Sequence, residues 1–272
     1  MTAFVLVAGG HAGGWVWDEV VARLWRSGAE AYPATLTGLG DRRHLAGPDT
    51  DLETHIEDLV QLIDHVAAPE VVLVGHCYGI YPVVGAADRR PERVSRVVYL
   101  DSPLPQDGHS MLDQVRAEMT DQETRERLLG QVERAEEGWR IPPPSPAEWR
   151  RWGNLVGVSE DAFARLARLA APHPLATQTQ PLGLSGAVDE LPLSGIFCTA
   201  GGGTTIAMVE ALVATGNPRF QALAEPRAGF FELDTGHWPM LSAPDELVEV
   251  LFRAAAGEGH RLAADRRVPS GG

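Results

Sequence analysis

The 272-residue sequence lacks the features that mark several large classes of protein. It has only two cysteines, Cys77 and Cys198, which is too few for a disulfide framework. No apolar run approaches the length of a membrane span. No basic segment followed by an apolar one precedes the first expected strand. We therefore expect a cytoplasmic protein that does not bind membranes.

Positive charge is also scarce. The chain carries 37 acidic and 23 basic side chains, for a net charge of −14, which disfavours nucleic acid and anionic membrane surfaces as partners. The nine histidines form no His-Glu-x-x-His pattern, so we expect no metal. The first glycine loop lacks the Gly-Lys-Ser/Thr ending and the dinucleotide spacing, so we expect no cofactor.

The most informative motif lies between Val71 and Gly79. Four apolar residues, three of them β-branched, predict a strand buried on both faces. A Gly-x-Cys-x-Gly turn centred on Cys77 follows, and Ile80 to Asp88 predicts a helix. This order is typical of a nucleophile elbow, with Cys77 where a serine usually stands. The alternative is an inert buried thiol.

Short apolar strands alternate with helices along much of the chain. This pattern predicts an α/β fold with a mostly parallel central sheet flanked by helices. A capping box, Thr50-Asp51-Leu52-Glu53, is expected to begin the second helix. The strands are expected at 4–8, 29–35, 71–74, 94–100, 195–199 and 230–233, and further helices at 15–25, 80–88, 206–214 and 243–256.

Residues 104–191 have a different pattern, because strand signals vanish and prolines separate helical stretches at 111–137 and 160–170. We expect an inserted helical cap, or lid, that covers the cleft of a core built from residues 1–103 and 192–257. A floppy linker is the alternative, but tryptophans at 139, 149 and 152 argue against it. Residues 258–272 are expected to form a flexible tail.

A cysteine nucleophile needs a base, and a group that orients this base. His237 follows the last expected strand in a Gly-His turn, which suits the base. The loop after the strand ending at Thr199 contains no carboxylate, so Asp101 is the leading acid, unless it only caps its own turn. Asp234 is the fallback, and Asp189 is weaker.

Backbone N–H groups are expected to hold the oxyanion of an acyl-transfer reaction. Tyr78 would supply one of them and Gly9 or Gly10 the other. His11 and Trp238 are expected to line the substrate pocket, although His11 could equally face solvent or cap a turn.

Several segments carry a resemblance to the α/β-hydrolase superfamily, nearest to hydroxynitrile lyases, plant methylesterases and similar bacterial esterases. The segments are LVAGGHAGGWVW (6–17), LTGLGDR (36–42), VGHCYG (74–79), VVYLD (97–101) and Gly236-His237. The resemblance implies an α/β-hydrolase fold and a role in small-molecule, secondary metabolism. Three departures stand out: the usual serine is Cys77, the usual first-loop histidine is Ala8, and the usual acid after the 195–199 strand is absent.

Together these observations predict an esterase or thioesterase that takes a small ester-like substrate. Cys77 would attack a carbonyl, His237 would transfer the proton, and Asp101 would orient the imidazole. One alternative is a lyase of the same fold with His237 as base, which eliminates acetate from an acylated tetronate-like intermediate or cleaves as hydroxynitrile lyases do. The other is a non-catalytic small-molecule binder, as among plant hormone receptors.

Overall fold

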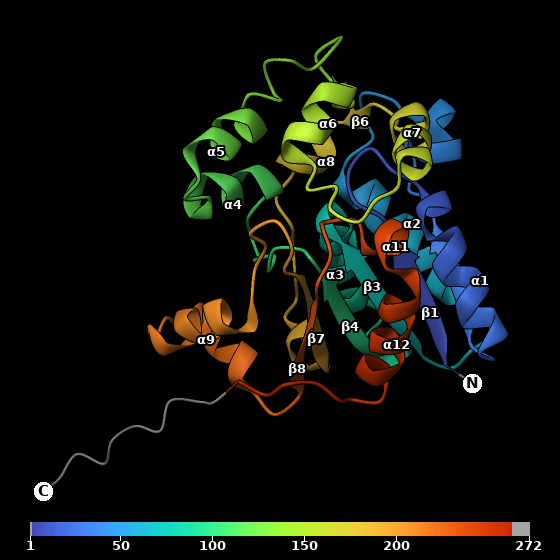
Figure 1. Ribbon diagram of the computed structural model, residues 1–272, viewed down its shortest axis with the longest axis vertical. Coiled ribbons are helices and arrows are strands. Elements are labelled where there is room, and N and C mark those ends of the chain that lie inside the picture. The colour runs from blue at the N-terminus through green and yellow to red at the C-terminus, as the bar shows by residue number, and fades with distance from the viewer. Residues whose placement is uncertain (1, 263–272) are drawn as a thin grey trace, which may run out of the picture.

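A six-stranded parallel sheet forms the centre of the protein (Figure 1). The computed structural model describes residues 2–262. The strand order is β2-β1-β3-β4-β7-β8, and every neighbouring pair is parallel. The strands are β1 (Ala3–Val7), β2 (Glu30–Ala34), β3 (Val71–His76), β4 (Val94–Leu100), β7 (Leu193–Cys198) and β8 (Ala228–Leu233).

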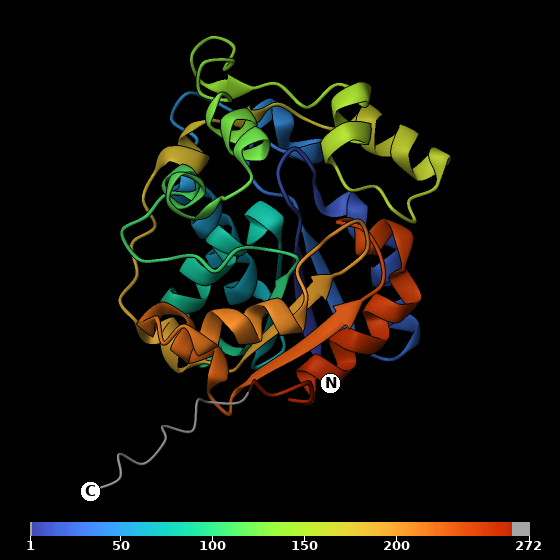
Figure 2. The same ribbon diagram turned by 60° about the vertical axis from the view of Figure 1, so that its left-hand side comes forward.

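Helices bury both faces of this sheet, which explains why β1 and residues 71–74 of β3 are apolar throughout. The helices α1 (Asp18–Arg26) and α12 (Pro244–Ala255) pack on one face, against residues such as Phe4 and Val74. On the other face α2 (Leu52–His65) and α3 (Ile80–Arg89) cover Val5 and Leu73. Figure 2 shows α9 (Ile206–Ala214) on that second face, beside β8.

Residues 104–191, called the cap segment below, place most of their elements above the carboxyl ends of the central strands (Figure 1). The helices are α4 (Met111–Glu118), α5 (Gln122–Leu129), α6 (Pro146–Trp152), α7 (Glu160–Leu169) and α8 (Ala176–Thr179). A short antiparallel ribbon joins β5 (Arg140–Ile141) to β6 (His173–Pro174). No helix within residues 2–262 has both the length and the apolar composition that crossing a membrane requires.

Shorter helical turns connect these elements. Two are α-helical, namely α10 (Pro218–Gln221) and α11 (Pro239–Ser242). The others are 3-10 turns at Gly14–Trp17, Gly40–Leu45, Cys77–Gly79, Pro91–Arg93, Ala187–Glu190 and Ala222–Ala224.

Three local expectations were wrong. The second helix is capped one residue later, because Asp51 accepts a hydrogen bond from the Thr54 N–H at 2.9 Å. The helix expected over 111–137 is two helices, because the Asp121 side chain caps α5 and interrupts the run. The ribbon of β5 and β6 was missed altogether, since two-residue strands leave no periodic signal.

The ends of two expected segments pack against the core. Near the end of the cap segment, the N–H groups of Ser185 (2.6 Å) and Val188 (3.0 Å) donate hydrogen bonds to Asp88 of α3 in the core. The expected flexible tail begins in an ordered position, because His260 exchanges two backbone hydrogen bonds with Phe230 of β8. The remainder of that expectation, residues 263–272, lies outside the described residues.

Candidate active site

Cys77 lies in a tight turn directly after β3, with a positive φ of 52°. A side chain at either flanking glycine would collide with the backbone. A Cβ on Gly75 would lie 2.6 Å from the Cα of Ile80, and a Cβ on Gly79 would lie 2.5 Å from the carbonyl oxygen of Ala8. The Gly-x-Cys-x-Gly pattern therefore has the steric cause expected of an elbow.

The structure brings Asp101 and His237 to the same edge of the sheet as Cys77. Asp101 follows β4 and His237 follows β8, and the His237 Nδ1 lies 2.5 Å from the Asp101 Oδ2. The other carboxylate oxygen of Asp101 accepts a hydrogen bond from the Cys198 N–H at 3.2 Å. The rival acids Asp234 and Asp189 are both exposed to solvent.

The three side chains shift one another's proton affinities. Burial lowers the pKa of His237, but the Cys77 thiolate and the Asp101 carboxylate outweigh burial and raise it to about 10. Burial raises the pKa of the Cys77 thiol, but the charge and hydrogen bond of His237 bring it below its ordinary value. Burial likewise raises the pKa of Asp101, and the hydrogen bond from His237 lowers it below its ordinary value. These directions favour a thiolate–imidazolium pair.

The backbone N–H groups expected to form an oxyanion site belong to Tyr78 and to Gly9 or Gly10. The Tyr78 N–H helps to lower the pKa of the Cys77 thiol. Gly9 packs beneath the nucleophile, since a Cβ there would lie only 2.9 Å from the Cβ of Cys77. Gly10 lines the cavity instead, and its N–H has no acceptor among the described residues. Of the two expected glycines, Gly10 is the one that can reach a ligand.

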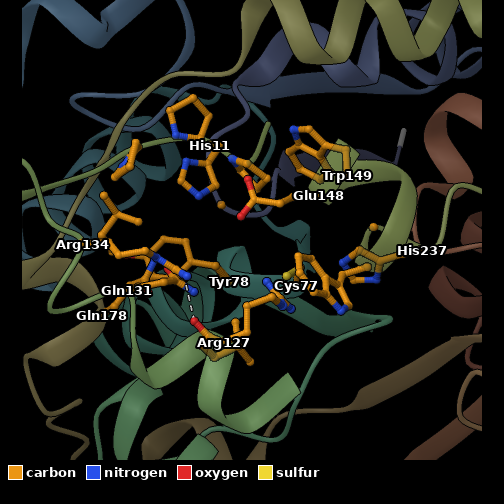
Figure 3. Close-up of a pocket in the computed structure, with 18 of the residues that line it drawn as sticks. His11, Cys77, Tyr78, Arg127, Gln131, Arg134, Glu148, Trp149, Gln178 and His237 are labelled. Atoms are coloured by element: carbon orange, nitrogen blue, oxygen red, sulfur yellow. Dashed lines mark hydrogen bonds between the residues drawn. The ribbon is translucent and has the colours of Figure 1, made fainter. Parts of the chain in front are cut away.

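A cavity of about 320 Å³ opens above Cys77, between the elbow and the cap segment (Figure 3). Its walls are largely apolar, with a few charged or polar groups. The apolar side chains are Met111, Leu128, Ile141, Pro142, Pro143, Pro144, Trp149, Trp152 and Trp238, and the polar ones include His11, Arg127, Gln131, Arg134, Glu148 and Gln178.

The structure places both expected pocket residues on this cavity. His11 Nδ1 donates a hydrogen bond to the carbonyl oxygen of Ala171 at 2.9 Å, and burial lowers the pKa of His11 to about 4. This imidazole is therefore neutral and lies inside the protein, not in solvent. Trp238 is 2% exposed, and its ring packs edge-on against those of His237 and Trp149.

Three residues that fix the position of the loop carrying His237 were missed by the sequence reasoning. His76 Nε2 donates a hydrogen bond to the His237 carbonyl at 2.7 Å, and burial lowers the pKa of His76 to about 3, so its ring is neutral. Asn154 accepts the His237 N–H at 2.9 Å, and Val156 accepts the Gly236 N–H at 3.1 Å. No periodicity or motif connects these positions, so the sequence offered no signal for them. The charged cavity residue Arg127 was missed for the same reason.

The fold agrees with the comparisons to known proteins. Residues 4–250 match the model of the alpha/beta hydrolase family, and the chain belongs to that family. It is 31% identical over 253 residues to a carbendazim hydrolyzing esterase of Nocardioides sp. (strain SG-4G), covering 92% of this chain and 98% of that one. It is 23% identical to methylesterase 9 of Arabidopsis thaliana, covering 94% and 98%.

Solved structures show the same architecture. An extracellular alpha/beta-hydrolase from a Paenibacillus species superimposes with a TM-score of 0.74 at 20% identity, covering 93% of this chain and 99% of that chain. Tomato methylketone synthase I superimposes with a TM-score of 0.71 at 22% identity, covering 94% and 98%. At these identities the likeness concerns the fold.

Proposed function

We propose that this α/β-hydrolase cleaves a small-molecule carboxylic ester or thioester through a covalent intermediate on Cys77. The observation that carries the proposal is the arrangement of Cys77, His237 and Asp101 at one edge of the sheet, with the His237 Nδ1 held 2.5 Å from a carboxylate oxygen and the charge of His237 lowering the pKa of the Cys77 thiol. The esterase names of relatives that cover nearly the whole chain support the reaction class. A cytoplasmic role in secondary metabolism remains part of the proposal.

The first half-reaction begins with the Cys77 thiolate attacking the carbonyl carbon. The carbonyl π electrons move to the oxygen, which accepts hydrogen bonds from the Tyr78 and Gly10 N–H groups. Collapse of this tetrahedral species breaks the bond to the alkoxide or thiolate leaving group. His237 donates its Nε2 proton to that group, and an acyl-Cys77 thioester remains.

The second half-reaction consumes water. Neutral His237 removes a proton from a water molecule as the water oxygen attacks the thioester carbonyl carbon. Collapse releases the carboxylic acid and returns Cys77 as a thiolate beside an imidazolium. Asp101 keeps the Nδ1 proton in place throughout, so that Nε2 faces the reaction.

Intact-mass spectrometry after exposure to a panel of activated esters and thioesters tests the covalent step. The expected result is an acyl mass that appears on the wild-type protein and on Cys198→Ala but not on Cys77→Ala. Cys198 is the matched control, because it is the other cysteine and it is fully buried. Turnover by the wild type with no adduct trapped, and full turnover by Cys77→Ala, would overturn the proposal.

Product analysis separates hydrolysis from the lyase alternative. With ¹⁸O-labelled water, hydrolysis places one labelled oxygen in the released acid, because water attacks the acyl carbon. An alkene or aldehyde product with no label in the acid would instead identify an elimination or a carbon–carbon cleavage, with His237 acting as base on carbon.

A further inference from the structure

A half-buried arginine in the cap segment faces the nucleophile across the cavity. Arg127 extends from α5, and Figure 3 shows its guanidinium pointing toward Cys77. The Arg127 Cζ lies 5.4 Å from the ring centroid of Trp152, and the Arg127 Nε is buried with no hydrogen-bond partner among the described residues. Within residues 2–262 no carboxylate oxygen lies within 4.0 Å of this guanidinium.

This unpaired charge contrasts with the arginines that pair with a carboxylate and with the acidity of the whole protein. Arg89 and Arg90, for example, each make two hydrogen bonds with one carboxylate. Acidic side chains outnumber basic ones by 37 to 23, so a shortage of carboxylates does not explain why Arg127 has no carboxylate partner. Burial lowers the pKa of Arg127, which shows that its charge is held at a cost.

The one acidic side chain lining the cavity interacts with the charge of Arg127 but forms no ion pair with it within 4.0 Å. Glu148 is held by its own helix cap, where its Oε2 accepts hydrogen bonds from the Ser145 N–H at 2.8 Å and the Ser145 hydroxyl at 2.7 Å. Arg134, whose guanidinium donates to the Arg127 carbonyl at 2.9 Å, adds a second positive charge near the cavity rim. Apart from the catalytic groups, the charged side chains that line the cavity are thus two arginines and one glutamate.

We propose that Arg127 binds a carboxylate on the substrate, so that the enzyme acts on esters or thioesters of small dicarboxylic acids or their equivalents. A guanidinium presents donors in a planar fork that matches the two oxygens of a carboxylate. The apolar wall formed by Met111, Leu128 and Trp152 suits the carbon chain that separates the two ends of such a substrate. This substrate class rests on the proposed function.

A kinetic comparison of matched substrates tests the proposal. Monomethyl glutarate carries the anion, and methyl 5-methylhexanoate replaces its carboxylate with an isopropyl group of similar shape. We expect the wild type to prefer the anionic ester by about tenfold or more in kcat/KM, at this chain length or in the succinate or adipate pair. Preference for the neutral ester at every length would overturn the proposal without reference to any variant.

Substitutions on α5 then assign the preference to one side chain. Arg127→Gln should abolish the discrimination, and Arg127→Lys should keep part of it because the charge remains without the fork. Arg125→Gln is the matched control, since Arg125 lies on the same helix and is exposed, and its substitution changes the net charge by the same amount as Arg127→Gln. Equal discrimination in the Arg127→Gln and Arg125→Gln proteins would also overturn the proposal.

A binding measurement distinguishes failure of this proposal from failure of the proposed function. In Cys77→Ala no acyl-enzyme can form, so calorimetric titration with monomethyl glutarate reports binding alone. We expect binding that weakens by about tenfold or more when Arg127→Gln is added and is unchanged by Arg125→Gln. If monomethyl glutarate binds in this way but the wild type turns over no ester, the hydrolase assignment is wrong and the anion site stands. If the wild type turns over neutral esters but shows no binding that depends on Arg127, the anion site is wrong and the hydrolase assignment stands.

Discussion

The imidazole of His237 meets the carboxylate of Asp101 at 2.5 Å, although the two residues are 136 positions apart in the chain. The contact forms at the carboxyl edge of the sheet, where β4 delivers Asp101 and β8 delivers His237. The loop after β7 contains no carboxylate, and β7 itself contributes the N–H of its last residue, Cys198, which donates to Asp101. Asp101 therefore comes from β4, which is next to β3 and the nucleophile, and not from β7, which lies one strand farther away.

Asp101→Asn should reduce turnover by about a hundredfold or more, because an amide does not stabilise the imidazolium and can favour the wrong tautomer. Steady-state kinetics on a turned-over ester measures this loss, and circular dichroism checks that the fold is intact. Asp234→Asn is the control, since Asp234 is exposed and only three residues before His237. Equal losses in both variants would contradict the role given to Asp101.

Alkylation of Cys77 by iodoacetamide should follow a pH profile with a midpoint below the value of about 8.5 for an ordinary thiol. The charge and hydrogen bond of His237 lower the pKa of Cys77, so the thiolate persists to lower pH. His237→Gln removes that charge and should move the midpoint upward. A wild-type midpoint of alkylation at or above that of a free thiol would rule out the ion pair.

Turnover should fall as pH rises through about 10, where His237 loses the proton that the leaving group needs.

Gly236→Ala should displace the loop that carries His237. A Cβ at this position would lie 2.3 Å from the carbonyl oxygen of Asn154, which is closer than real atoms approach. A shift of the imidazole by about 1 Å can lower turnover about a hundredfold, and kcat measures that loss. Gly183→Ala is the control, since a Cβ there meets nothing within 4 Å. Unchanged kcat in Gly236→Ala would show that the loop relaxes without moving its base.

Tyr78→Phe should lower the free energy of unfolding by about 1–3 kcal/mol, because a buried acceptor loses its partner. The Tyr78 hydroxyl donates to His55 Nδ1 at 2.8 Å, and His55 Nε2 donates to the Thr37 carbonyl at 2.8 Å. Denaturant unfolding measures the difference. Tyr32→Phe removes a hydroxyl that bonds Glu30 in a less buried setting and should change stability by less. Similar losses in the two variants would show that burial of His55 carries no penalty.

The sequence predicted the fold correctly, and the physical reason is local. The α/β-hydrolase fold is confirmed, because apolar strands buried on both faces and the glycines around Cys77 leave signals within a few residues. The missed features are non-local. Nothing near Arg127 indicates that α5 turns it into the cavity, and nothing near His76 indicates that its ring bonds the His237 carbonyl. The catalytic roles of Cys77, His237 and Asp101 stay predictions that the experiments above address.

The backbone contacts of Asn154 and Val156 have a consequence for how ligands reach the cavity. These two residues lie in the connector between α6 and α7, and their carbonyls hold the N–H groups of His237 and Gly236. A hinge through that connector would pull the base away from the sulfur. Any movement of the cap segment that leaves His237 in place would therefore have to keep residues 154–156 fixed against the core.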